Sequence, residues 1–84
     1  MKWTVTWLPS AERTLTDLWV NAPDRNAVAA AANRIDQDLE RDPLSAGESR
    51  QGDTRIHIVE PLAVLFDVDP AQRTVTVWSV WRIS

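Results

Sequence analysis

The last third of the chain constrains the fold most, because it contains three consecutive segments with the composition of β-strands: Arg55–Glu60, Leu62–Val68 and Thr74–Ile83. Pro61 cannot donate a hydrogen bond to a sheet, so it marks a turn between the first two segments. The middle segment is nearly all apolar, as expected for a central strand that is covered on both faces. Because the connections are short, we expect an antiparallel meander.

Side-chain alternation along these strands sets the expected positions of the large and charged residues. Because successive side chains of a strand point to opposite faces, Trp78 and Arg82 are predicted to share one face of the last strand. Trp81 then lies on the other face, so one of the two tryptophans should be more exposed than the other. By the same rule, Arg55 and His57 share a face of the first meander strand.

The first half of the chain reads as one strand followed by two helices. Lys2–Trp7 alternates apolar and polar residues with a period of two, which predicts a half-buried strand. Pro9–Val20 has apolar residues at helical spacing and a proline where the first turn of a helix tolerates one. Arg25–Arg41 contains the run AVAAAA, which strongly favours a helix. The polar segment Leu44–Asp53 holds both glycines and predicts a loop.

These elements predict an α+β fold. We expect a four-stranded antiparallel sheet with an αα hairpin on one face, in the order β-α-α-β-β-β, and with the first strand at an edge of the meander. Trp3, Trp7 and Trp19 are predicted to fill the core between the sheet and the helices.

The composition excludes several classes of protein. The chain has 84 residues, so we expect a single domain over residues 1–84. It has no Cys and one His, which excludes a metal site built from several of these residues, and we expect no metal or cofactor. A net charge of -3 argues against a general electrostatic nucleic-acid binder. With no membrane-spanning run and no signal-peptide pattern, we expect a cytoplasmic protein that does not bind membranes.

Three stretches spread along the chain carry a resemblance to a known family: the helix start LPSAERTL, the Asp-Pro-Leu after the second helix, and the final PLAVLFDVDPAQRTVTVWSVWR. In these stretches the chain resembles the RelE/ParE toxin superfamily, the plasmid-stabilisation type of toxin from type II toxin–antitoxin modules. The resemblance implies a toxin that a cognate antitoxin neutralises. RelE-like members cleave messenger RNA on the ribosome, whereas ParE-like members poison DNA gyrase without a hydrolytic site.

The resemblance also indicates where catalytic residues would stand. The family often has an Arg in the central strand, where this chain has Ala63, and a basic pair near the end of the last strand, where this chain has Arg82 and then Ile83. Tyrosine, which several members use, is absent from the chain. We therefore expect a toxin-like protein that acts mainly by binding proteins: an antitoxin, and a target such as gyrase or the ribosome. The alternatives are a ribosome-dependent mRNA endoribonuclease of RelE type and a non-toxic relative that serves as a binding domain. The sequence does not specify the oligomeric state.

The candidate site lies among the C-terminal cations. In the ribonuclease interpretation Arg82, Arg55 and His57 are catalytic, because attack by a ribose 2′-hydroxyl needs a base, and the phosphate needs cations. The predicted binding residues are Arg50, Arg73, Trp78 and Trp81. We hypothesise that Arg50 and the three catalytic candidates line a groove beside the second helix, with Trp78 or Trp81 as an aromatic wall for single-stranded RNA. The alternative is that these cations are solvated strand residues and that Trp81 belongs to the core.

Overall fold

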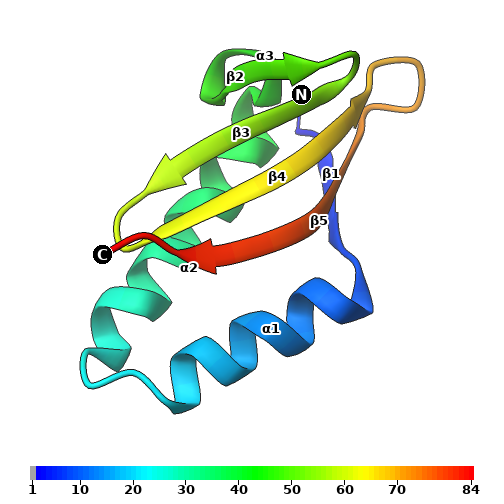
Figure 1. The fold of residues 1–84 in the computed structure, drawn as a ribbon. Helices are drawn as coiled ribbons and strands as arrows, with labels where there is room; N and C mark the ends of the chain where they lie inside the picture. The colour runs from blue at the N-terminus through cyan, green and yellow to red at the C-terminus, as the bar shows by residue number, and fades with distance from the viewer. Residues whose placement is uncertain (1) are drawn as a thin grey trace.

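The computed structural model describes residues 2–84, and within that range it has five strands and three helices (Figure 1). In chain order these are β1 (Thr4–Trp7), α1 (Pro9–Val20), α2 (Arg25–Arg41), α3 (Pro43–Ala46), β2 (Glu48–Gln51), β3 (Thr54–Val59), β4 (Leu62–Asp69) and β5 (Thr74–Arg82). The α+β class is confirmed. The meander and the two long helices lie close to the predicted positions.

The sheet differs from the prediction in two ways. It has five strands in the order β1-β5-β4-β3-β2, and β1 runs parallel to β5, whereas the prediction had four antiparallel strands. The extra strand, β2, lies in the segment predicted to be a loop. Its sequence ESRQ is polar throughout, so it lacks the alternation of apolar residues from which a strand is predicted. The parallel pairing is possible because a long crossover separates β1 from β5, and parallel strands need such a connection. The prediction that β1 joins an edge of the meander is correct.

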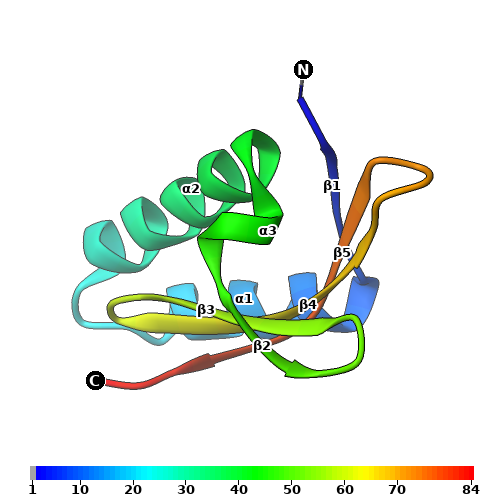
Figure 2. The same ribbon diagram turned by 90° about the horizontal axis from the view of Figure 1, so that it is seen from above.

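The helices pack from one side of the sheet, and Figure 2 shows α2 and α3 there. α2 presents one buried stripe, Val28, Ala31, Ile35 and Leu39, which recurs every three or four residues as expected for an amphipathic helix. Against it pack buried residues of the two central strands: Leu62, Val64, Phe66, Val68, Val75, Val77 and Val80. α1 runs beside β5, and its Leu15 and Leu18 pack against the same core. No helix of residues 2–84 lies over the opposite face, which we call the helix-free face.

A β-bulge in β5 changes the predicted faces of the residues that follow Trp78. Phe66 pairs with Val77 but Leu65 pairs with Ser79, so Trp78 is the extra residue in β5. A bulge of one residue shifts every later side chain to the other face. Trp78 itself continues the alternation of Thr74 and Thr76 on the helix-free face, where its Nε1 donates a hydrogen bond to Oδ1 of Asp67 at 3.3 Å. The prediction that Trp78 and Trp81 occupy opposite faces is wrong, because Trp81 pairs with Ala63 on the helix-free face as well. The prediction that Trp78 and Arg82 share a face is also wrong, because Arg82 pairs with Leu62 on the helix side.

The three tryptophans of the N-terminal part, Trp3, Trp7 and Trp19, differ in how far they are buried. Trp3 and Trp7 pack against the core as predicted, and Nε1 of Trp7 donates to Oδ1 of Asp36 in α2 at 2.7 Å. Burial raises the pKa of Asp36 above its usual value. Trp19 does not fill the core: it is 41% exposed on α1, and the guanidinium of Arg25 lies 5.2 Å from its ring centre.

Candidate functional site

Arg82 lies at the end of β5 and reaches the start of α2. Its Nη1 and Nη2 donate hydrogen bonds to the two carboxylate oxygens of Asp24, at 2.8 and 2.7 Å. This two-pronged contact is the strongest form of Arg–carboxylate pairing. The hydrogen bonds from Arg82 hold the pKa of Asp24 below its usual value, and the same bonds raise the pKa of Arg82. The pair joins the last strand to the N-terminus of α2, so Arg82 has a structural partner.

Arg55 lies on β3 and holds the short helix α3. Its Nη2 donates to the carbonyl oxygens of Leu44 and Gly47, at 2.7 and 2.6 Å. Carbonyl groups at the C-terminal end of a helix have no partner within the helix, so a cation there is stabilising. The Nε atom of Arg55 is buried and has no hydrogen-bond partner among the described residues.

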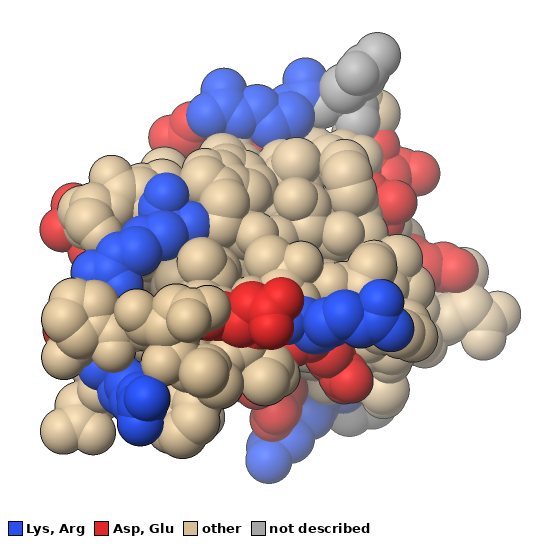
Figure 3. All heavy atoms as spheres, turned by 60° about the horizontal axis from the view of Figure 1, so that its bottom comes forward, with Lys and Arg blue, Asp and Glu red and all other residues tan. Residues whose placement is uncertain are grey.

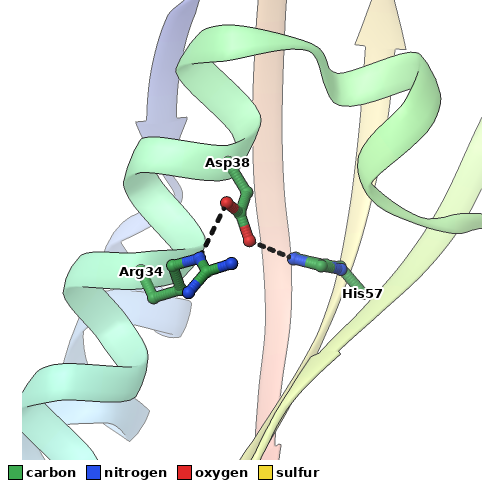
Figure 4. A network of polar contacts seen from close by, with 3 residues as sticks. All are labelled: Arg34, Asp38 and His57. Carbon is green, nitrogen blue, oxygen red and sulfur yellow. Dashed lines mark hydrogen bonds and ion pairs between the residues drawn. The ribbon is translucent and has the colours of Figure 1, made fainter.

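His57 faces α2 and takes part in a polar network with Asp38 and Arg34 (Figure 4). Its Nε2 lies 2.9 Å from Oδ2 of Asp38, and Nε of Arg34 donates to Oδ1 of the same carboxylate at 3.0 Å. Burial raises the pKa of Asp38, but the hydrogen bonds from His57 and Arg34 outweigh this effect, and the pKa lies below its usual value. A carboxylate that orients an imidazole occurs in general-base sites, and also in purely structural ion pairs.

The four residues of the predicted groove do not come together. Arg50 and His57 share a hollow between β2, β3 and the end of α3. Arg82 lines a different hollow, beside α1 and the segment that leads into α2. Arg55 lines neither of these two hollows. The catalytic and binding roles of these residues stay predictions, and the hollow that Arg50 and His57 line is not the one that Arg82 lines.

Arg73 lies in the turn between β4 and β5 and contacts the N-terminal strand. Its guanidinium carbon lies 5.0 Å from the ring centre of Trp3, a distance suited to a cation–π contact. Its backbone has φ 51, and its carbonyl oxygen accepts a hydrogen bond from the N–H of Thr4 at 3.0 Å. Through these contacts Arg73 holds β1 against β5.

The helix-free face is largely apolar, and the strand registers define its members. Ile58, Ala63 and Trp81 form one cross-strand row, and Ile56, Leu65 and Ser79 form the next. Trp78 lies beside the second row, and Ile83 continues the alternation after Arg82. Ile58, Trp78 and Ile83 are 52%, 39% and 41% exposed. In the space-filling view, an area with neither Lys, Arg, Asp nor Glu extends over this part of the molecule, with charged residues around its margin (Figure 3).

Ala63 stands where the resemblance implies an arginine. It is fully buried at the centre of this face, between Ile58 and Trp81. No exposed apolar surface was predicted here from the sequence. The one signal for it was the apolar run Leu62–Val68, which is typical of a strand covered on both faces although the chain supplies helices for only one.

Solved structures with a similar fold show which proteins this chain resembles. A chain of the RelBE2 toxin–antitoxin complex of Mycobacterium tuberculosis superimposes with a TM-score of 0.79 and 25% identity, over 98% of this chain and 92% of that chain. The chain has the fold of the RelE/ParE toxin superfamily. The same RelE/ParE fold relates it to the isolated RelE toxin of E. coli, with a TM-score of 0.69 and 14% identity over 98% of this chain and 85% of that one. A chain of the ParDE system of P. aeruginosa gives a TM-score of 0.72 and 15% identity, over 98% and 97% of the two chains.

These structures confirm the resemblance to RelE/ParE proteins that the sequence indicated. No protein-family model matches the chain, and no curated protein matches it either. The RelE/ParE resemblance is therefore carried by the order and packing of the elements more than by residue identity.

Two further features concern metals and membranes. Within residues 2–84 there is no group of three or more His, Asp or Glu side chains placed to hold a metal ion. None of the helices in that range is long and apolar enough to cross a membrane.

Proposed function

We propose that this protein is the toxin-like component of a type II toxin–antitoxin module of the plasmid-stabilisation type, and that it acts in the cytoplasm mainly by binding other proteins. Several of the solved structures with the same fold are toxin–antitoxin complexes, which supports a cognate antitoxin as the first partner. The second partner is the target, and gyrase and the ribosome are the candidates.

The observation that carries this proposal is the chemistry of the helix-free face. A ribonuclease needs cations at the scissile phosphate, but this face presents Ile58, Leu65 and Trp81 and has Ala63 where the resemblance implies an arginine. Exposed apolar and aromatic side chains on a sheet face are typical of protein-binding surfaces. Arg82 and Arg55 are both engaged in structural contacts, which also favours binding over catalysis.

The second candidate function is the ribosome-dependent endoribonuclease. One observation favours it: the imidazole of His57 is oriented by Asp38 and opens into a hollow that Arg50 also lines. A base next to a cation is the minimum that cleavage at a 2′-hydroxyl requires.

Controlled expression in a bacterial host separates the proposals. We expect growth to stop on induction, DNA supercoiling or translation to fail, and transcripts to stay intact. Site-specific transcript cleavage that disappears in His57→Gln would instead establish the endoribonuclease. Normal growth at full expression of folded protein would contradict the toxin proposal and leave the non-toxic binding domain. An adjacent open reading frame whose product restores growth would supply the antitoxin.

A further inference from the structure

β2 forms one margin of the sheet and has a free edge. Among the described strands it pairs with β3 alone, because the strand order ends with β4-β3-β2 (Figure 1). Figure 2 shows α3 on the helix side of β2. A strand at the margin of a sheet presents backbone N–H and C=O groups that lack a partner strand. A further strand can therefore add to the sheet at β2.

Two side chains of opposite charge stand on this edge. Glu48 pairs with Ile56, a residue of the helix-free face, and alternation places Arg50 on the same face. Arg50 is the extra residue of a β-bulge, so it has no partner in β3. Glu48 and Arg50 are both exposed, and neither forms an ion pair within residues 2–84. Both charges are thus available to a neighbouring molecule.

The order of these charges is self-complementary. When two copies of β2 pair antiparallel about a two-fold axis at Ser49, Glu48 of each copy stands opposite Arg50 of the other. Opposite charges at directly opposed positions stabilise an antiparallel pair. An axis between Ser49 and Arg50 would instead set Glu48 against Gln51, and a parallel pairing would set Glu48 against Glu48. The charges therefore favour the antiparallel register about Ser49.

We propose that the outer edge of β2 is a homodimer interface, in which the β2 strands of two copies pair antiparallel and two Glu48–Arg50 ion pairs stabilise the contact. The two sheets then form one continuous sheet. Such an interface uses the same surface on both copies and closes at two copies. This inference does not rest on the proposed function, because it concerns contact of the chain with itself and requires neither an antitoxin nor a target.

The charges also disfavour unrelated strands at this edge. Charged side chains and bulges on an edge strand commonly prevent pairing with other chains. An unrelated strand leaves Glu48 and Arg50 unmatched, whereas a second copy supplies both opposite charges at the required spacing. The edge is therefore selective for a second copy of this chain.

The dimer also changes the surroundings of His57. Glu48, Arg50 and His57 line the same hollow. Because Arg50 of the second copy stands opposite Glu48, its guanidinium lies at the margin of this hollow. Each hollow of the dimer thus gains a cation from the other copy.

Sedimentation velocity of the purified whole protein tests for the dimer. The strand β2 has four residues, so the interface is small. Because small interfaces give weak complexes, the protein is measured from about 10 µM to about 1 mM. We expect the sedimentation coefficient to rise with concentration toward that of a dimer. A monomer over the whole range overturns the proposal.

Charge reversal locates the contact. Glu48→Arg opposes two cations at both ends of the strand pair, and Arg50→Glu opposes two anions. Each variant alone should weaken dimerisation at least about tenfold, because like charges at opposed positions are destabilising. An equal mixture of the two variants should form dimers as well as wild type, since every opposed pair then carries opposite charges again. The double variant Glu48→Arg with Arg50→Glu should also form dimers.

The matched controls lie on α1. Glu12→Arg and Arg13→Glu make the same charge changes at exposed positions outside β2, so they should leave dimerisation unchanged. Circular dichroism checks that every variant is folded. The proposal is wrong if the dimer persists in both β2 variants, if their mixture stays monomeric, or if the controls weaken the dimer equally. A dimer that Ile58→Asp dissociates but Glu48→Arg does not would place the contact on the helix-free face, which also contradicts the proposal.

Hydrogen exchange reports on the strand pairing itself. Backbone amides that are hydrogen-bonded in a sheet exchange slowly, whereas amides at a free edge exchange fast. The amides of β2 should therefore exchange more slowly at concentrations where the protein is dimeric. Those of β1, at the opposite margin of the sheet, should not change. Slower exchange at β1 and unchanged exchange at β2 would overturn the proposal.

Discussion

Arg82 connects two parts of the chain that are 58 residues apart, since its guanidinium binds both carboxylate oxygens of Asp24. If this contact is the role of Arg82, then Arg82→Ala and Asp24→Ala should lower the midpoint of thermal unfolding by similar amounts. The double variant should be little worse than either single one, because each change already removes the pair. Arg13→Ala, an exposed cation on α1, is the control.

A catalytic role makes a different prediction for the same variants. Arg82→Ala would then abolish activity with little change in stability, and Asp24→Ala would leave activity intact. Thermal unfolding and growth arrest measured on the same set of variants separate the two roles.

Asp38 gives the fold a predictable response to acid. Its pKa in the folded protein lies below the unfolded value of about 3.9, so its contribution to stability is fully present above that value and is lost as the pH falls through the folded pKa. We expect the stability of the wild type to fall more steeply than that of Asp38→Asn between about pH 5 and pH 3. Urea unfolding at several pH values measures this difference, and parallel curves for the two proteins would contradict the assignment.

Side-chain partners of this kind could not be predicted from the sequence. Alternation predicted correctly that Arg55 and His57 share a face, because face is a local property of a strand. Whether His57 meets Asp38 depends on how α2 lies across β3, which no local pattern specifies. The same holds for Arg82, whose partner is set by the packing of α2 against the end of β5.

Among the helices and strands, the close contact of Gly47 with β3 holds the segment Leu44–Asp53 in place, which the sequence predicts to be a loop. A Cβ atom at this position would overlap the carbonyl oxygen of Ile56 and would lie 3.2 Å from Cε1 of Phe66. We expect Gly47→Ala to destabilise the protein by about 1–3 kcal/mol, because backbone atoms cannot move aside easily. Denaturant unfolding measures the change.

Gly52 provides the matched comparison. A Cβ atom at this position would meet nothing within 4 Å, but the backbone adopts φ +58, a conformation that Asn tolerates better than Ala. Gly52→Asn should therefore lower the free energy of unfolding by less than Gly47→Ala does. Equal losses for the two variants would mean that the contact between Gly47 and Ile56 is unimportant.

The elements that the sequence predicted well are those with strong periodicity. The alanine-rich helix and the apolar strand β4 carry patterns that few other structures produce. β2 was missed because an edge strand of polar residues has no apolar alternation. The bulge at Trp78 was missed because an extra residue in one strand is defined only by its partner, and it moved Trp81 onto the face of Trp78.

For the whole molecule, the distribution of apolar surface is the main finding. The sequence already indicated the fold family, through the order of its elements and the final meander. It also showed that Ala63 and Ile83 stand where cations would be expected. The structure adds that Ala63 and its neighbours form one connected surface, and that this surface lies on the face without helices.

We propose that this protein acts through the apolar helix-free face and not through His57. The most direct test is growth arrest after induction of wild type, Ile58→Asp and His57→Gln at matched levels of folded protein, with transcripts mapped in each culture. We predict that wild type and His57→Gln stop growth with intact transcripts, and that Ile58→Asp does not stop growth. Transcript cleavage and growth arrest that persist in Ile58→Asp but vanish in His57→Gln would contradict the claim.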